Sequence, residues 1–215
     1  MSRKVIERET RKKLILKAAR QLFTDKGIEN TSMDDIAFAA EYTRRTLYAY
    51  FKSRDEISLS ILIEDLLIRW DEQKKTLTEA DTGLEKIKKW AESLYSFTLR
   101  YPHSIRLQLY WDFRGIDREL ISDETFAAFE KINNELAKGL RKIFHLGVSD
   151  GSLRSDLPVD LTISQFLYSY RSILNRALSS SYSFASFDPD EYVKYYLENF
   201  VRTIKNEGVK PNEII

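Results

Sequence analysis

Two arginines, a lysine and several hydroxyl groups are concentrated in residues 32–52, where the pattern predicts two short helices joined by a sharp turn. Ser32 precedes an acid by three residues, which is a typical start signal for a helix. Thr43 can cap the second helix in the same way. A helix this short is unstable alone, so it must dock onto the rest of the protein by its apolar side.

The outward side of the predicted second helix carries the groups that could do chemistry. Guanidinium groups match the two acceptors of a guanine edge, and hydroxyl and ammonium groups bind phosphate oxygens. Such a face suits duplex DNA, although a solvated basic helix face is the simpler alternative. The residues expected to point inward are Leu47, Ala49, Tyr50 and Phe51, and those expected to point outward are Arg44, Arg45, Thr46, Tyr48 and Lys52.

The elements around this stretch are predicted to be helical. Residues 3–26 form an amphipathic pattern that stops at Gly27. Ser53 and Glu56 fit a capping box, which predicts a helix that runs to about Lys75. This helix has apolar residues on more than one face, so we expect it to be buried between other helices.

The remainder of the chain also reads as helices, with no strand-like alternation of useful length. We predict an all-α fold of about nine helices, three in an N-terminal head and six in a C-terminal body. The six expected body helices are 53–75, 83–101, 104–113, 123–147, 159–179 and 188–206, separated by turn signals that include Pro102, Gly147 and Asp188-Pro189.

Composition limits the function classes. The chain has 215 residues, no Cys and only two His, so disulfides, a thiolate nucleophile and a Cys-ligated zinc site are excluded, and we expect no metal or cofactor. No apolar run is long enough to span a bilayer and the first residues lack a signal-peptide core, so we expect a cytoplasmic protein without membrane contact.

The charges are unevenly distributed along the chain. Residues 1–56 contain 13 Lys and Arg against 9 Asp and Glu, while the remainder has 21 against 24. A basic head on a mildly acidic body suits phosphate binding at one end.

The first quarter of the chain resembles the DNA-binding domain of the TetR family of bacterial repressors. The order and spacing of many positions agree, and the chain departs from the family mainly in the turn, where Glu41 stands in place of the usual Gly and Tyr42 in place of a small aliphatic residue. A non-Gly residue in a left-handed turn costs about 1 kcal/mol, so either the turn differs or the protein bears this cost. The matching residues are the run 15–23, Lys26-Gly27, Thr31-Ser32, Ile36-Ala37, Thr43, Thr46 to Tyr48, Tyr50-Phe51 and 53–56.

The resemblance implies a helix-turn-helix DNA-binding domain at 1–53 and a ligand-binding and dimerisation domain at 54–215. It implies a repressor that binds palindromic, double-stranded operator DNA as a homodimer and is released by a small-molecule effector. Thr43 and Tyr48 are assigned to phosphates by the family match, and the two arginines are assigned to base edges by their chemistry. The full set of candidate DNA-binding residues is Ser32, Tyr42, Thr43, Arg44, Arg45, Thr46, Tyr48 and Lys52.

Polar residues that interrupt apolar stripes suggest where an effector could bind. Asn133 and Arg171 take core positions in their stripes, and a buried polar group needs a partner. A ligand could be that partner, and internal hydrogen bonds to Tyr168, Asp112 or the backbone are the alternative. Nearby aromatic residues would suit an apolar or aromatic ligand. The candidate ligand-binding residues are Trp90, Trp111, Phe129, Asn133, Tyr168 and Arg171.

Large apolar residues on the last two predicted helices exceed what a small body needs, which indicates a dimer interface there. The alternative is that these residues close the core of the monomer. The candidates are Phe166, Tyr170, Ile173, Tyr192, Tyr196 and Phe200.

Two other functions have less support from the sequence. An enzyme is disfavoured because the sequence has no nucleophile elbow, phosphate loop or dinucleotide fingerprint. An architectural or division-linked DNA-binding dimer that lacks ligand control would keep the head and use the body only for dimerisation. A filled, rigid body would favour this alternative, and a cavity would favour ligand control.

Overall fold

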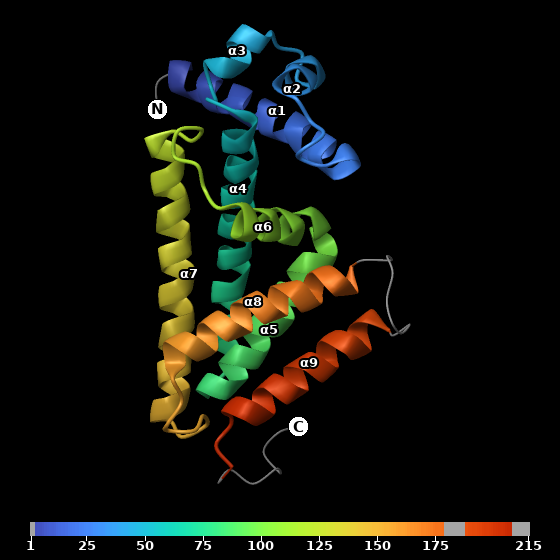
Figure 1. The fold of residues 1–215 in the computed structure, drawn as a ribbon. Helices are drawn as coiled ribbons and strands as arrows, with labels where there is room; N and C mark the ends of the chain where they lie inside the picture. Colours follow the sequence, from blue (N-terminus) through green and yellow to red (C-terminus); the bar gives the residue numbers. More distant parts are fainter. Residues whose placement is uncertain (1–2, 179–187, 208–215) are drawn as a thin grey trace. The chain divides into compact units, whose positions relative to one another are not determined.

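The computed structural model describes residues 3–178 and 188–207. Over this range the chain forms nine α-helices and one short 3-10 helix, and the only strand-like feature described is an isolated antiparallel bridge between Leu153 and Lys205 (Figure 1). The predicted all-α fold is therefore confirmed. The elements are α1 (Arg3–Lys26), α2 (Met33–Ala39), α3 (Arg44–Tyr48), α4 (Arg54–Thr76), η1 (Leu77–Glu79), α5 (Gly83–Arg100), α6 (Pro102–Arg114), α7 (Asp123–Ser149), α8 (Val159–Ala177) and α9 (Pro189–Ile204).

Local sequence signals explain most of these boundaries. Gly27 follows α1 with φ +83, a conformation that glycine adopts without steric cost. Thr82 caps α5 through a complete capping box with Glu85, and the Asp188 carboxylate accepts hydrogen bonds from the first amides of α9. Pro102 begins α6 two residues earlier than the sequence predicts, in a position where proline's missing amide is not needed.

The chain divides into two compact units. Among the described residues, unit 1 contains 3–67 and 110–132, and unit 2 contains 68–109, 133–178 and 188–207. Helices α4, α6 and α7 each contribute residues to both units. The predicted boundary after residue 53 therefore differs from the packing, because residues 54–67 of α4 and the start of α7 pack with the three N-terminal helices.

Unit 1 is held together by apolar residues from its three N-terminal helices. Ile15 of α1, Ile36 of α2 and Leu47 of α3 are each 0% exposed. Helices α2 and α3 are too short to persist in isolation, so this shared core is what fixes them. Arg20 of α1 adds an ion pair to Asp65 of α4 at 2.6 Å.

Unit 2 packs α8 and α9 side by side, with α5 against α9 (Figure 1). Its core contains a stack of aromatic rings that includes Phe166, Tyr170 and Phe200. The centroids of Phe166 and Phe200 lie 4.3 Å apart at an interplanar angle of 19°. Tyr170 is completely buried and donates its hydroxyl hydrogen to the carbonyl of Ala91 at 2.8 Å.

This core changes the expectation for the dimer interface. Phe166, Tyr170 and Phe200 are 0%, 0% and 8% exposed, so they close the core of their own protomer and offer a partner almost no surface. The other three candidates, Ile173, Tyr192 and Tyr196, are half-buried. Three of the six predicted contacts therefore face the core of their own protomer, and a dimer interface on α8 and α9 stays a prediction.

Candidate nucleic-acid interface

The first helix of the predicted pair begins with a complete capping box. The Ser32 hydroxyl accepts a hydrogen bond from the Asp35 amide at 3.1 Å, and the Asp35 carboxylate accepts one from the Ser32 amide at 2.7 Å. The hydrogen bonds from Ser32, followed by those from Lys26, hold the pKa of Asp35 well below its usual range. The carboxylate therefore stays charged at the positive end of α2.

The turn between α2 and α3 contains a strained residue. Glu41 has φ +58, and it is the only non-glycine residue with positive φ in the described part of the chain. Since a side chain disfavours this conformation, the protein bears the predicted cost of about 1 kcal/mol at the position where the family uses Gly. The turn geometry is thus kept in spite of the substitution.

Helix α3 is docked by one residue and capped by another. Leu47 is completely buried, while the Thr43 hydroxyl accepts a hydrogen bond from the Thr46 amide at 3.1 Å. Phe51, just beyond the helix, is also buried. Ala49, which the sequence places inward, is exposed because the helix ends at Tyr48.

The two arginines of α3 are both exposed but differ in their surroundings. The Arg44 guanidinium lies 3.0 Å from the Asp34 carboxylate and 5.6 Å from the ring centroid of Tyr48. Tyr48 and Asp34 both raise the pKa of Arg44. Arg45 forms no ion pair with any residue that the structure describes, so its guanidinium is available to a ligand.

The remaining predicted DNA-binding residues lie in the same unit. Tyr48 is 45% exposed, whereas Tyr42 and Thr46 are half-buried. The Lys52 ammonium donates a hydrogen bond to the Ile121 carbonyl at 3.4 Å, in the loop before α7. Lys52 is exposed and its side chain would have to leave this carbonyl to reach a phosphate.

One exposed residue was missed by the sequence reasoning. Phe38 of α2 is 88% exposed, an unusual position for a phenylalanine. The helical pattern contained the signal, because Phe38 lies two residues after the buried Ile36 and so points to a different face. Phe38 also lies one helical turn after Asp34, so it shares a side of α2 with the residue that pairs with Arg44.

A buried carboxylate joins the start of α4 to the start of α7. Glu56 is 2% exposed and accepts hydrogen bonds from the Lys52 amide at 2.5 Å, from the Thr125 hydroxyl at 2.8 Å and from the Ser122 hydroxyl. We name Glu56, Ser122 and Thr125 the Glu56 clamp. The Ser53 hydroxyl accepts from the Glu56 amide as the capping box predicts, but the Glu56 carboxylate bonds to Lys52 and α7 instead of completing the box.

The electrostatics of the clamp favour an ionised Glu56. Burial alone would raise the pKa of this carboxyl, but hydrogen bonds from Ser122, Lys52 and Thr125 outweigh burial and lower it. An ion pair nearby joins Arg114 at the end of α6 to the buried Asp55 at 2.8 Å. The residues just after α3 are therefore tied to α6 and α7 within unit 1.

The six predicted ligand residues are divided between the two units. Trp111 and Phe129 belong to unit 1, and the other four belong to unit 2. Trp90 is 1% exposed and packs on Phe166 in the core, whereas Tyr168 is 59% exposed. The Arg171 guanidinium lies 4.9 Å from the Tyr168 ring centroid, which is a cation–π contact with the ring and not the hydrogen bond considered from the sequence. Asn133 is half-buried and has interactions within the chain.

Comparison with known proteins identifies the family. The sequence model described as "Bacterial regulatory proteins, tetR family" matches residues 15–61. The chain is 30% identical over 153 residues to the HTH-type transcriptional repressor KstR2 of Mycolicibacterium smegmatis, and this match covers 71% of the chain and 72% of the relative. The chain belongs to the TetR family of bacterial regulatory proteins. As a TetR-family member it is a DNA-binding transcriptional regulator that acts as a dimer and responds to a small molecule.

Solved structures of TetR-family proteins share the fold of this chain along almost its whole length. The ketosteroid transcriptional regulator KstR2 of Mycobacterium tuberculosis gives a TM-score of 0.67 at 19% identity, covering 92% of this chain and 96% of that chain. The fatty acid degradation regulator FadR from Bacillus halodurans gives 0.67 at 16% identity, covering 88% and 94%. None of the helices described here is long and apolar enough to cross a membrane.

Proposed function

We propose that this TetR-family regulator is a repressor whose homodimer places α3 of each protomer in the major groove of a palindromic operator. The observation that carries this proposal is the arrangement of α3, in which buried Leu47 anchors the helix while Arg44 and Arg45 are exposed. A short, rigidly docked helix with two guanidinium groups suits the recognition of base edges.

The two arginines take different roles in this proposal. Arg45 makes the direct base contact, because no described acid competes for its guanidinium. Arg44 must exchange Asp34 for DNA, so it contributes less net affinity. The hydroxyls of Thr43 and Tyr48 hold phosphates and fix the helix in the groove.

The dimer interface uses the outer faces of α8 and α9. Leu161 and Tyr168 of α8 are 73% and 59% exposed, and Tyr195 of α9 is 67% exposed. These residues replace Phe166, Tyr170 and Phe200 as the proposed contacts. A two-fold dimer puts its two recognition helices about one DNA turn apart, roughly 34 Å, which makes two half-sites necessary.

Effector control passes through the Glu56 clamp. Helices α4 and α7 both have residues in unit 2, and in unit 1 the clamp joins their first turns immediately after α3. A ligand that shifts either helix therefore acts on the position of the recognition helix. The effector is a small, largely apolar molecule, which is consistent with similar proteins named for ketosteroids and for fatty acid degradation.

The test is selection of DNA by the purified protein from a random duplex pool, with sedimentation of the protein–DNA complex. The proposal predicts enrichment of a two-fold symmetric site that binds one dimer. Arg45→Ala should select the same symmetry with one position relaxed in each half-site. Enrichment of an asymmetric site, or binding by a monomer, would contradict the proposal.

A further inference from the structure

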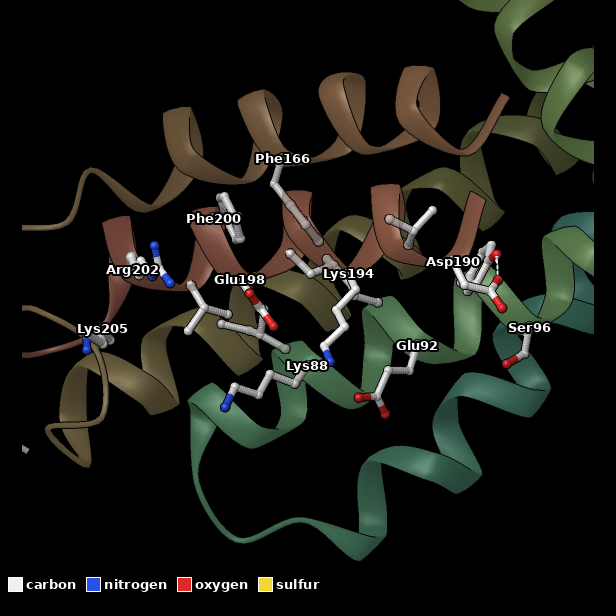
Figure 2. Close-up of a pocket in the computed structure, with 16 residues that line it drawn as sticks. Lys88, Glu92, Ser96, Phe166, Asp190, Lys194, Glu198, Phe200, Arg202 and Lys205 are labelled. Atoms are coloured by element: carbon white, nitrogen blue, oxygen red, sulfur yellow. Dashed lines mark hydrogen bonds between the residues drawn. The ribbon is translucent and has the colours of Figure 1, made fainter. Parts of the chain in front are cut away.

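A groove of about 600 Å³ lies between α5 and α9, entirely within unit 2 (Figure 2). This volume is in the range of about 300 to 1,000 Å³ that is typical of small-molecule sites. Its floor is apolar and partly aromatic, so burying the hydrocarbon part of a ligand there lowers the free energy of binding. The residues that form the floor are Ile87, Ala91, Phe166, Leu197, Phe200 and Val201.

One end of the groove is closed by an internal hydrogen bond. Tyr95 of α5 donates its hydroxyl hydrogen to the carboxylate of Asp190 at the start of α9 (Figure 2). Burial, followed by this hydrogen bond, raises the pKa of Tyr95 to about 12. The phenol therefore stays protonated at neutral pH and Asp190 stays satisfied, so this end offers little to a charged ligand.

The other end of the groove is basic. Because Tyr95 near the end of α5 meets Asp190 at the start of α9, the two helices run in opposite directions. Lys88 near the start of α5 is thus on the same side of the groove as Arg202 and Lys205 at the end of α9 (Figure 2). None of these three cations has an ion-pair partner among the residues described. Glu198 also lines this region, and it is exposed to solvent rather than paired with them.

We propose that this groove binds a small amphipathic anion, with its apolar body on the floor and its carboxylate or phosphate head beside Lys88, Arg202 and Lys205. Charge complementarity selects this occupant, because unpaired cations next to an apolar floor match a molecule with one charged end. A neutral ligand would leave these three positive charges uncompensated, and a positively charged ligand would be repelled by them. The role of the groove as an effector site rests on the function proposed above. Its binding of an amphipathic anion does not depend on that function.

The test is calorimetric titration of the full-length protein, without DNA, with sodium dodecanoate below its micelle concentration. Dodecanol and dodecyltrimethylammonium have the same hydrocarbon length with a neutral and a cationic head. Dodecanoate should bind about tenfold more tightly than either, since exposed charge pairs contribute only modestly. Equal binding of all three compounds would overturn the assignment of the basic end.

Three variants locate the site. Val193→Trp should abolish binding by filling the groove, and the double variant Arg202→Glu and Lys205→Glu should weaken dodecanoate but not dodecanol. Because Arg202 is exposed and Lys205 is only half-buried, we expect this double variant to fold even if Val193→Trp does not. The matched control is Lys142→Glu, an exposed lysine of α7 outside the groove, which should bind dodecanoate normally.

Two outcomes would overturn the proposal. Binding that none of the groove variants alters places the site elsewhere. Alternatively, dodecanoate does not bind and Val193→Trp converts the dimer to a monomer. This result would show that the groove is an interface between copies of the chain. Failure of the repressor function is recognised separately, because the selection of DNA described above uses no ligand.

Discussion

Thr125 of α7 donates its hydroxyl hydrogen to the carboxylate of Glu56 on α4 at 2.8 Å, although 69 positions separate the two residues in the sequence. The same carboxylate accepts a hydrogen bond from the amide of Lys52, which follows the recognition helix. One buried group thus joins the end of α3, the helix that we propose reads DNA, to two long helices.

Glu56→Gln should lower the free energy of unfolding by about 1 to 3 kcal/mol, because the amide nitrogen cannot accept the hydrogen bonds that a carboxylate oxygen accepts. Urea denaturation measures this difference. The matched control is Glu124→Gln, also at the start of α7, where the glutamate side chain is 82% exposed and pairs with Lys12 only at 3.8 Å. The control should change stability by less than about 0.5 kcal/mol, and equal losses in the two variants would count against the clamp.

The contribution of Glu56 should also depend on pH. Its pKa is lower in the folded protein than in the unfolded chain, so its stabilising effect is fully present above the unfolded pKa of about 4.3 and is lost as the pH falls through the folded pKa. The difference in stability between the wild type and Glu56→Gln should therefore shrink at acid pH. Urea denaturation of both proteins at pH 7 and at decreasing acid pH tests this, and a difference that stays constant would show that ionisation does not matter.

Glu41→Gly should stabilise the protein by up to about 1 kcal/mol, because glycine removes the strain of a positive φ. Glu41→Val should destabilise it, since a branched side chain fits this conformation worse. Ala40→Gly is the neighbouring control, at φ −86, where glycine should cost stability through its greater freedom in the unfolded chain. If both glycine variants lost stability equally, the turn would carry no strain.

Arg45→Ala should relax DNA specificity by about 1 to 3 kcal/mol at one base pair of each half-site. Binding of each variant to the selected operator and to its single-base changes, at one salt concentration, measures this. Arg154→Ala, in unit 2 and outside the recognition helix, is the control and should leave the preferences intact. Uniform weakening across all the duplexes would instead make Arg45 a phosphate contact.

The sequence was sufficient to predict the helices, including those of the N-terminal head, because the signals that start and stop a helix are local in the sequence. Caps such as Ser32 and Thr43 and the stops at Gly27 and Pro102 act over a few residues, and the structure uses each of them. At Glu41 the sequence left two alternatives, a different turn or a strained residue, and the positive φ of Glu41 decides for the strained residue.

The tertiary features could not be predicted because they depend on which helix faces meet. The aromatic residues Phe166, Tyr170 and Phe200 gave the same periodic signal whether they faced a partner or the core of their own protomer. The bonds from Glu56 to Ser122 and Thr125, and the groove between α5 and α9, join segments that are distant in the chain. Periodicity describes one helix at a time, so it contains no information on such pairs.

Linkage between ligand and DNA tests the central claim most directly. The affinity of the protein for dodecanoate is measured with and without saturating operator DNA, and the affinity for operator is measured with and without dodecanoate. If the ligand controls the DNA-reading helix, both affinities should fall by one common factor of about 5 to 150, which corresponds to a coupling of about 1 to 3 kcal/mol. A tightly bound ligand whose affinity is the same with and without operator would contradict the account.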